Sequence, residues 1–335
     1  MAQARSTSFD VARLAGVSRA TVSYVLNGRT DQSISEPTRQ RVLDAARTLE
    51  YVPNAASRAL RSGASRLVVL VNPGLPWSTN IADFEDAFTD EVAATGRSLV
   101  VWRRQAPDDL ATLLANLEPC AVISQGHLAR TEREILARLR IPLVEADIGL
   151  PGAQLPTRLQ AECLQAYGHR RIGYLTTSDP SLQPFAEPRT AAFRAACADL
   201  GLPEPLVAAV PGGLSVRPSD VAAQLTAWTT DDDPVTAVAC FNDLHAAVCL
   251  TAAQQVGLWV PYDLAVIGLD DDIFAPTTFP PLTSVRIDAP AFAAHLWATA
   301  RHRLGEAPAP KPYQPSARLV ERASVRPSDP ERNLS

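Results

Sequence analysis

The sequence predicts a small all-α helix-turn-helix domain followed by a larger α/β region with doubly wound parallel sheets. Three observations lead to this prediction. Apolar residues in the first fifty positions follow helical spacing. From residue 66 onward, short apolar runs alternate with helical stretches, as in doubly wound parallel sheets. The alternation then continues after the turn at Gly168.

The bulk composition is that of a globular protein. With 335 residues, 46% of them hydrophobic and 20% charged, the chain has room for two or three domains. The five cysteines are scattered without a zinc spacing, so we expect reduced, mostly buried thiols and no metal. The polar start and the lack of any run of about 20 apolar residues predict a cytoplasmic protein with no membrane contact.

The charge is distributed unevenly along the chain. Ten arginines and five acidic residues give residues 1–66 a net charge of +5, whereas the whole chain carries −5. A basic head on an acidic body suits a nucleic-acid-binding module attached to a second domain.

The first predicted helix begins near Phe9. Val11, Leu14 and Ala15 stand three to four residues apart or adjacent, so we expect them to share one buried face. Gly16 follows, and a glycine can end a helix in the left-handed conformation without steric cost.

The second helix follows a tight turn. Ser18 can cap it by accepting a hydrogen bond from the amide near Thr21. Its apolar face contains Val22, Val25 and Leu26. Its outer face contains Arg19, Ala20, Ser23 and Tyr24. Two helices in this arrangement form the helix-turn-helix design, which places the second helix in a DNA major groove. The alternative is an ordinary helical hairpin packed on a larger domain.

A third helix is expected from 35 to 49, with Ser35 as its cap. Its buried face would contain Val42, Ala46 and Leu49. A short fourth helix over 55–61 is too short to be stable alone. Its leucine, Leu60, stands between two arginines and could wedge into a minor groove, although a plain linker is the alternative.

Several motifs together resemble the lactose-repressor (LacI/GalR) family of bacterial regulators. They are Asp10-Val11-Ala12, Ala15-Gly16-Val17-Ser18, Ala20-Thr21-Val22-Ser23, Val25-Leu26-Asn27-Gly28, Tyr51-Val52-Pro53-Asn54 and Ala59-Leu60-Arg61. The resemblance implies a dimeric repressor with a hinge helix and a two-lobed sensor domain of periplasmic-binding-protein type. It also implies that the hinge leucine, here Leu60, opens the minor groove at the centre of the operator.

Four segments follow from this organisation. They are the helix-turn-helix domain 1–53, the hinge helix and linker 54–65, the two-lobed effector-binding and dimerisation domain 66–326, and a disordered tail 327–335. The expected strands of the two lobes are 66–72, 98–102, 121–124, 142–145, a strand entered from the 168–171 turn, 206–210, 237–241, 265–269 and 317–323. The expected helices are 81–95, 108–117, 130–139, 159–167, 189–200, 219–229, 244–256 and 290–304.

The DNA-contacting residues are expected in three groups. The residues facing base edges in the major groove are Arg19, Ala20, Ser23 and Tyr24, and an arginine that reads guanine contributes roughly 1–3 kcal/mol of discrimination. The candidates for phosphate contacts are Thr7, Ser18, Thr21, Asn27 and Thr38. The hinge residues expected in the minor groove are Ser57, Arg58 and Leu60.

Three residues match the ligand-contacting pattern of the family. Arg189 is expected at a helix start, where its guanidinium suits hydroxyls or carboxylates. Asn242 and Asp270 follow strands, at the edge where open α/β sheets bind ligands. Asp243 is expected to cap a helix. For each site residue, a structural ion pair or cap is the alternative.

The first lobe departs from the family pattern. The stretch 74–80 replaces the usual sequence after the first strand, and Trp77 or Asn80 is the candidate to line the cleft. The segment 147–159 is shorter than usual and lacks the usual Asp-Asn pair. The effector, a sugar or related metabolite if it follows the family, therefore stays open.

The predicted function is a homodimeric transcriptional repressor on a palindromic operator, controlled by a small-molecule effector. The acidic run 270–272 has no accompanying nucleophile or phosphate-binding motif, so neither an enzyme nor a cofactor is expected. The alternatives are an exported solute-binding protein, an enzyme on the same fold, an activator, and a regulator with a protein partner. The operator and the target genes are not predicted.

Overall fold

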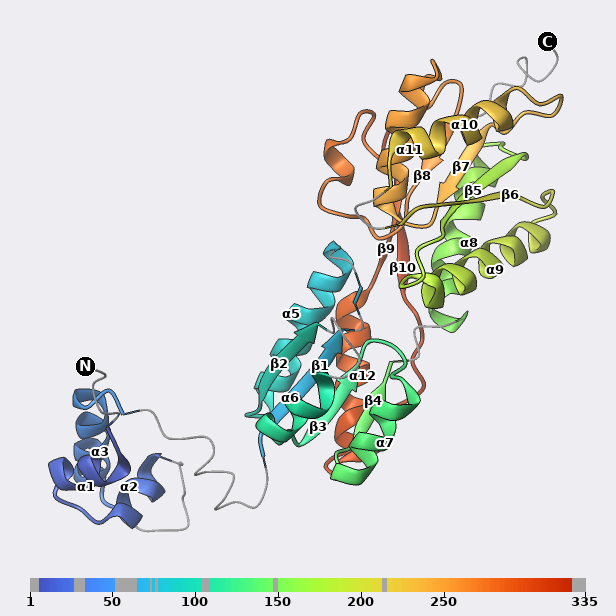
Figure 1. Cartoon of the computed structure of the whole chain (residues 1–335). Coiled ribbons are helices and arrows are strands. Elements are labelled where there is room, and N and C mark those ends of the chain that lie inside the picture. The colour runs from blue at the N-terminus through green and yellow to red at the C-terminus, as the bar shows by residue number, and fades with distance from the viewer. Residues whose placement is uncertain are drawn as a thin grey trace. The chain divides into compact units, whose positions relative to one another are not determined.

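The computed structural model describes residues 6–26, 34–51, 65–72, 74–75, 78–103, 109–146, 150–212 and 216–326. The chain divides into two compact units, Met1–Arg66 and Leu67–Ser335 (Figure 1). The expected hinge helix, the 327–335 tail and the site residues Asn27, Ser57, Arg58, Leu60 and Trp77 fall wholly or almost wholly outside the described residues.

The N-terminal unit contains the three predicted helices, α1 (Ser8–Ala15), α2 (Arg19–Leu26) and α3 (Glu36–Thr48). They meet in an apolar core that includes the fully buried Val11 and Val42. Gly16 ends α1 with a φ of 65°, and the Ser18 hydroxyl accepts the Thr21 amide at 3.1 Å. Both turn predictions are confirmed, and together they set the direction in which α2 leaves α1.

One expectation for this unit is wrong. Leu14 is 53% exposed, because α1 buries Val11, Ala12 and Ala15 instead. Ser35 is the N-cap residue of α3, as predicted, but its side chain makes no capping bond to a backbone amide. Its hydroxyl donates to the Thr38 hydroxyl at 3.0 Å, since the two side chains lie three residues apart at the helix start.

Lobe 1 of the second unit is a parallel sheet with strand order β2-β1-β3-β4. Its strands are β1 (Leu67–Asn72), β2 (Ser98–Arg103), β3 (Ala121–Ser124) and β4 (Leu143–Glu145). Its helices are α5 (Thr79–Ala94), α6 (Asp109–Leu117), α7 (Arg130–Leu139) and the later α12 (Ala289–Arg303). Alternate β1 residues pack to opposite faces. Leu70 packs with Phe88 and Trp297 of α5 and α12, and Val71 packs with Leu110 of α6.

Lobe 2 repeats this design with strand order β6-β5-β7-β8. Its strands are β5 (Ile172–Thr177), β6 (Leu206–Val210), β7 (Ala237–Cys240) and β8 (Ala265–Ile267). Its helices are α8 (Leu150–Ala166), α9 (Gln183–Asp199), α10 (Pro218–Thr229) and α11 (Asp243–Gln255). Residues of α8 and α9 pack on one face of the sheet, and residues of α10 and α11 pack on the other. The predicted fold class is confirmed.

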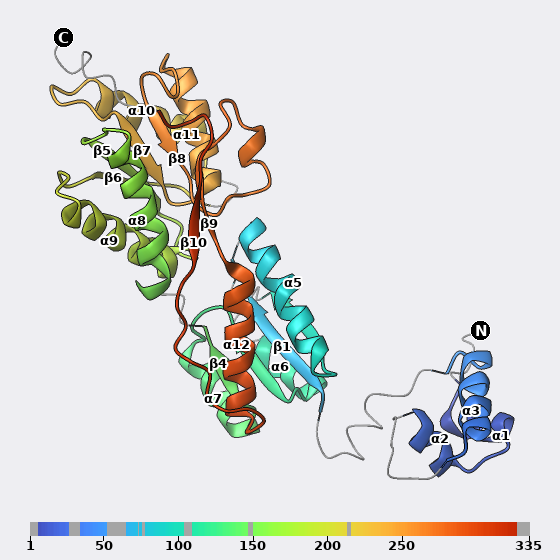
Figure 2. The same cartoon turned by 180° about the vertical axis from the view of Figure 1, so that it is seen from behind.

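The C-terminal part of the chain joins the lobes. Strand β9 (Ser284–Ile287) leaves lobe 2 after the short helix η2 (Ala275–Thr277), and α12 then packs in lobe 1. Strand β10 (Ala317–Val320) pairs antiparallel with β9 on the way back, as the reverse view shows (Figure 2). The sequence reading missed β9, which is only four residues long.

Two predicted helices begin earlier than expected. The helix expected at 159 begins at Leu150, and the helix expected at Arg189 begins at Gln183. Each contains a proline, Pro156 or Pro188. In α9 the turn ahead of the proline buries Ala186, so packing keeps that turn helical despite the missing amide. Arg189 therefore lies inside the helix and not at its start.

None of the described helices combines the length and the apolar composition needed to cross a bilayer. All five cysteines are free thiols, and four of them are buried. Within the described ranges, no group of three or more acidic, histidine or cysteine side chains is placed to hold a metal ion.

The packing of β5 against α10 generates a test of the fold. A Cβ at Gly173 would stand 2.6 Å from the Trp228 ring. Gly173→Ala should therefore lower the free energy of unfolding by about 1–3 kcal/mol, measured by urea denaturation. In a Trp228→Leu background the same substitution should cost clearly less. An equal cost in both backgrounds would show that this contact is absent.

Candidate functional site

The exposed face of α2 presents the four side chains predicted to face DNA bases. Arg19 and Ala20 are exposed, and Ser23 and Tyr24 are partly exposed. The opposite face is anchored by Val22 and Val25, which are 1% and 4% exposed. The amphipathic pattern thus points the predicted residues away from the core.

The candidate phosphate-binding hydroxyls gather at helix starts. Thr7 caps α1, with its own amide donating to the Asp10 carboxylate at 3.0 Å. Hydrogen bonds from Thr7 lower the pKa of Asp10, so this capping carboxylate stays ionised. Ser18 and Thr21 stand at the start of α2, and Thr38 stands in the first turn of α3. Free amides at helix starts favour anions.

The sequence reading missed a groove beside α2. It has a volume of about 620 Å³ and includes Arg13 and Arg19 in its wall. Phe9, which is 57% exposed, forms part of the same wall. Phe9 lies outside the buried face of α1, and this exposed apolar side chain is the sequence feature that could have indicated the groove.

In lobe 2 the structure brings Arg189 and Asp270 together. The Arg189 guanidinium donates to the Asp270 carboxylate at 3.3 Å and to the carbonyl of Phe241 at 2.7 Å. It also lies over the Phe241 ring, 4.8 Å from the centroid. The side chains of Arg189 and Asp270 keep 15% and 9% of their surface exposed. A charged pair with a small exposed area beside an aromatic ring can exchange its mutual hydrogen bond for one to a polar ligand.

The cap of α11 is Asn242 and not Asp243, the residue that was expected to cap it. Asn242 is the cap of α11, and its side-chain oxygen accepts the His245 amide at 3.0 Å and the His245 Nδ1 at 2.6 Å. Asp243 is already inside the helix and only 1% exposed. The prediction that Asp243 caps the helix is wrong, because β7 ends at Cys240 and the extended residue before the helix is Asn242.

Burial dominates the ionisation of this site. It raises the pKa of Asp270 to about 6, against the charge of Arg189, while Asp272 adds to the rise. Burial and the nearby Arg189 charge lower the pKa of His245 to about 4, so this imidazole is neutral near pH 7. The site therefore offers one permanent cation, one titrating carboxyl and one neutral ring.

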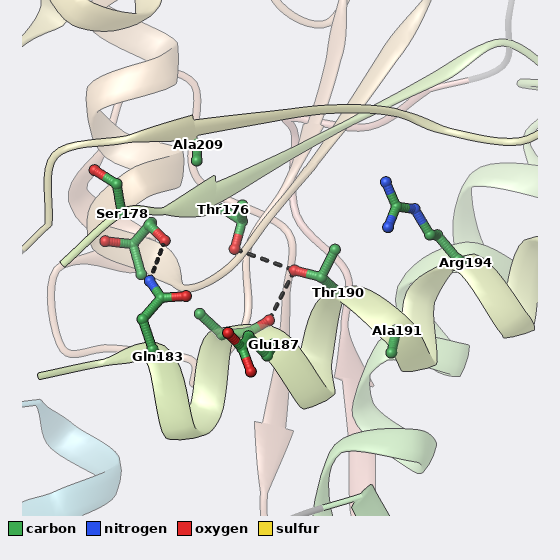
Figure 3. Close-up of a pocket in the computed structure, with 10 residues that line it drawn as sticks. Thr176, Ser178, Gln183, Glu187, Thr190, Ala191, Arg194 and Ala209 are labelled. Atoms are coloured by element: carbon green, nitrogen blue, oxygen red, sulfur yellow. Dashed lines mark hydrogen bonds between the residues drawn. The ribbon is translucent and has the colours of Figure 1, made fainter. Parts of the chain in front are cut away.

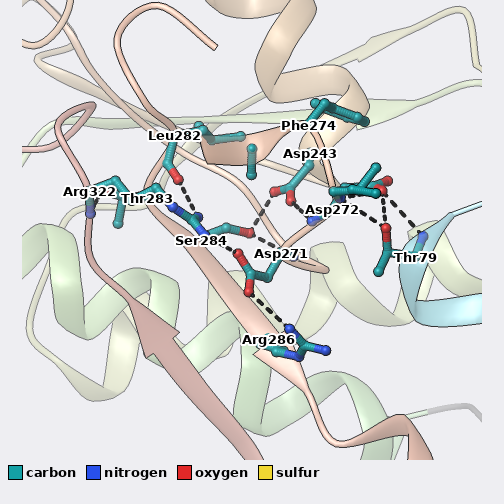
Figure 4. Close-up of polar contacts among 12 residues, drawn as sticks. Thr79, Asp243, Asp271, Asp272, Phe274, Leu282, Thr283, Ser284, Arg286 and Arg322 are labelled. Carbon is teal, nitrogen blue, oxygen red and sulfur yellow. Dashed lines mark hydrogen bonds and ion pairs between the residues drawn. The ribbon is translucent and has the colours of Figure 1, made fainter. Parts of the chain in front are cut away.

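Within the acidic run 270–272, Asp271 and Asp272 send their carboxylates to different partners (Figure 4). Asp271 pairs with Arg322, which follows β10, at 2.7 Å, and it lies 3.6 Å from Arg286 of β9. Asp272 accepts the amide of Thr79, at the start of α5, at 3.3 Å. Only the first of the three aspartates thus faces Arg189, and the other two belong to the junction of the lobes.

An apolar cluster joins the lobes beside Arg189. Leu75 of lobe 1 packs with Leu182, Ala186 and Phe241 of lobe 2. The Leu75 carbonyl accepts a hydrogen bond from Arg103 at 2.9 Å, which ties Leu75 to the last residue of β2. The cluster covers the same Phe241 whose ring carries Arg189.

A separate pocket lies within lobe 2 (Figure 3). Its volume is about 540 Å³, and its walls come from α9 and from β5 and β6. Figure 3 shows Thr190 and Thr176 joined across it, with a 3.2 Å hydrogen bond between the hydroxyls. It contains none of the predicted effector residues, so pocket volume alone does not identify them.

Comparison with known proteins matches both units. Residues 9–54 match a model described as "Bacterial regulatory proteins, lacI family", and residues 161–325 match a "Periplasmic binding protein-like domain". The HTH-type transcriptional repressor PurR of Photobacterium profundum is 29% identical over 303 residues, which cover 84% of this chain and 86% of that protein. The HTH-type transcriptional regulator DegA of Bacillus subtilis is 28% identical over 310 residues, with the same coverage.

A solved structure extends the likeness to the whole fold. The lac repressor dimer bound to operator and the anti-inducer ONPF superposes with a TM-score of 0.77. The match covers 96% of this chain and 99% of that one, at 24% identity.

The raised pKa of Asp270 generates a test of the site. Its native pKa of about 6 lies above the ordinary value of 3.8, so its contribution to stability is present below about pH 4 and is lost as the pH rises through 6. Asp270→Asn cannot ionise. The unfolding free energy of this variant, relative to the parent, should rise by about 1–3 kcal/mol between pH 4 and pH 7. Urea denaturation at both pH values measures it, and a difference that does not change with pH contradicts the assignment.

Proposed function

The chain belongs to the lacI family of bacterial regulatory proteins, and from this membership we propose that it is a sequence-specific DNA-binding repressor. It acts as a homodimer on a palindromic operator and responds to a small-molecule effector. The exposed face of α2 is the observation that carries this proposal, since it presents Arg19, Ala20, Ser23 and Tyr24 on a helix that its buried face holds in place.

Each group of DNA contacts has a proposed role. Arg19 and Tyr24 reach base edges together with Ala20 and Ser23. The hydroxyls of Thr7, Ser18, Thr21 and Thr38, with Asn27, bind phosphates and set the register. Ser57, Arg58 and Leu60 enter the minor groove between the two half-sites.

The homodimer is supported by apolar side chains exposed on lobe 2. Phe279 is 95% exposed, and Trp259, Ile273 and Tyr262 expose more than half of their surface. Burial of these side chains between two copies would remove apolar surface from water. A symmetric dimer would present two copies of α2 to a two-fold-symmetric site.

The effector proposed for the second unit is a small polar molecule, with a sugar or related metabolite as the leading class. Arg189 and Asp270 would bind its hydroxyl or acidic groups, with Asn242 beside them and Trp77 as a candidate from lobe 1. The chain is a regulator and not an enzyme, in line with its relatives. We place it in the cytoplasm, where it meets DNA.

Selection of duplex DNA by the purified full-length chain tests the proposal. At near-physiological salt, we expect enrichment of one site with two-fold symmetry, because a dimer presents two equal reading helices. Recovery of no common site, or binding that modest salt abolishes for every sequence, would contradict a sequence-specific repressor.

The selected site also separates base contacts from phosphate contacts. Arg19→Ala should relax the preference at one symmetric pair of positions, measured by repeating the selection. Arg47→Ala is a matched control on α3, since its exposed side chain pairs with Asp44 at 3.0 Å within the same helix. This control should leave the base preferences unchanged. A uniform loss of affinity with Arg19→Ala would assign Arg19 to phosphate instead.

A further inference from the structure

Two polar contacts join helix α5 of lobe 1 to lobe 2, and both involve the acidic run 270–272. In the first contact, Thr79 donates its amide to Asp272 at 3.3 Å and its hydroxyl to the same carboxylate oxygen. The Thr79 hydroxyl also accepts the amide of Ile273 at 2.9 Å (Figure 4). Three hydrogen bonds thus join the start of α5 to Asp272 and Ile273.

The second contact lies one helical turn further along α5. Asp83 accepts a hydrogen bond from Arg286 of β9 at 2.9 Å. The other terminal nitrogen of Arg286 lies 3.6 Å from Asp271, whose second oxygen is held by Arg322 at 2.7 Å. Residues 79 and 83 share one face of α5, since they are four apart. This face is therefore held at two points, at Thr79 by the Asp272 carboxylate and at Asp83 by Arg286, which also lies beside Asp271.

The acidic run is itself held from inside lobe 2. The buried Asp243 accepts the Asp272 amide and the Ser284 hydroxyl, each at 2.6 Å. The Ser284 oxygen in turn accepts the Asp271 amide at 3.1 Å. Asp270 and Asp271 adopt positive φ angles of 110° and 52°, which turn successive carboxylates in different directions. The run is therefore a short, well-anchored segment between Arg189 and α5.

We propose that Asp271 and Asp272 are positioning residues that set the orientation of the two lobes according to the state of Asp270. While Asp270 is paired with Arg189, the adjoining carboxylates hold α5 in the contacts described above. A ligand that draws Arg189 away from Asp270 shifts the run and thereby the lobes. The effect of a ligand rests on the proposed effector site, whereas the role of Asp271 and Asp272 in positioning α5 does not.

Pulsed dipolar spectroscopy of the full-length chain tests this. Nitroxide labels are attached through Ala137→Cys in α7 and Ala227→Cys in α10, which are exposed positions of the two lobes. Cys120→Ser removes the one cysteine that is not buried. Dilution with unlabelled protein suppresses distances between copies. Asp272→Ala and the milder Thr79→Val should broaden and shift the interlobe distance distribution relative to the parent.

Two further variants sharpen the result. Arg189→Leu removes the partner of Asp270 and should also shift the distribution. Glu162→Gln is the control. It weakens the exposed ion pair between Arg158 and Glu162 within α8, whose N–O distance is 2.7 Å, and should leave the interlobe distance distribution unchanged. If the folded Asp272→Ala and Thr79→Val proteins show the same distances as the parent, the contact between Thr79 and Asp272 does not position α5, and the proposal is wrong. Parent-like distances in Arg189→Leu overturn its link to Asp270. No DNA or effector is present, so these outcomes are independent of the selection experiment.

Discussion

The organisation of the second unit depends on the hydrogen bonds that the buried carboxylate of Asp243 accepts from Asp272 and Ser284. Burial of an ionisable group is costly unless hydrogen bonds compensate, and here burial raises the pKa of Asp243 to about 7. The amide of Asp272 and the hydroxyl of Ser284 offset that cost. There is no room for a side chain at Gly268, because a Cβ there would stand 1.9 Å from the carboxylate. One buried group thus fixes the segment that faces both Arg189 and lobe 1.

The lobes meet through apolar as well as polar contacts. Leu75 packs on Phe241, which in turn lies under the Arg189 guanidinium. A ligand that reaches Arg189 and Asp270 must therefore compete both with their mutual hydrogen bond and with contacts between the lobes. Ligand binding and lobe orientation are coupled to the extent that the ligand favours one arrangement over the other. Such coupling is expected because Phe241 contacts both Arg189 and Leu75 of lobe 1, so the ligand-binding residues lie directly beside the junction of the lobes.

Local signals explain what the sequence predicted correctly. Gly16 and Ser18 specify the turn before α2 from their own backbone and hydroxyl chemistry, and the structure agrees. Arg189 and Asp270 were each predicted as ligand contacts through the family resemblance, and the structure brings them together. The sequence reading misassigned the cap of α11 because one residue in the end of β7 decides between Asn242 and its neighbour. It gave no sign that Asp272 binds Thr79, since 193 positions separate the two residues and neither lies in a recognisable motif.

Hydrogen–deuterium exchange of the full-length chain, with and without the selected duplex, most directly tests whether DNA occupancy is coupled to the junction between the lobes. The expected result is slower exchange within residues 6–51 together with altered exchange at the amides of Thr79, Asp272 and Ile273, which donate at this junction. Protection confined to residues 6–51, with unchanged exchange at those three amides, would contradict a regulator whose sensor unit responds to DNA.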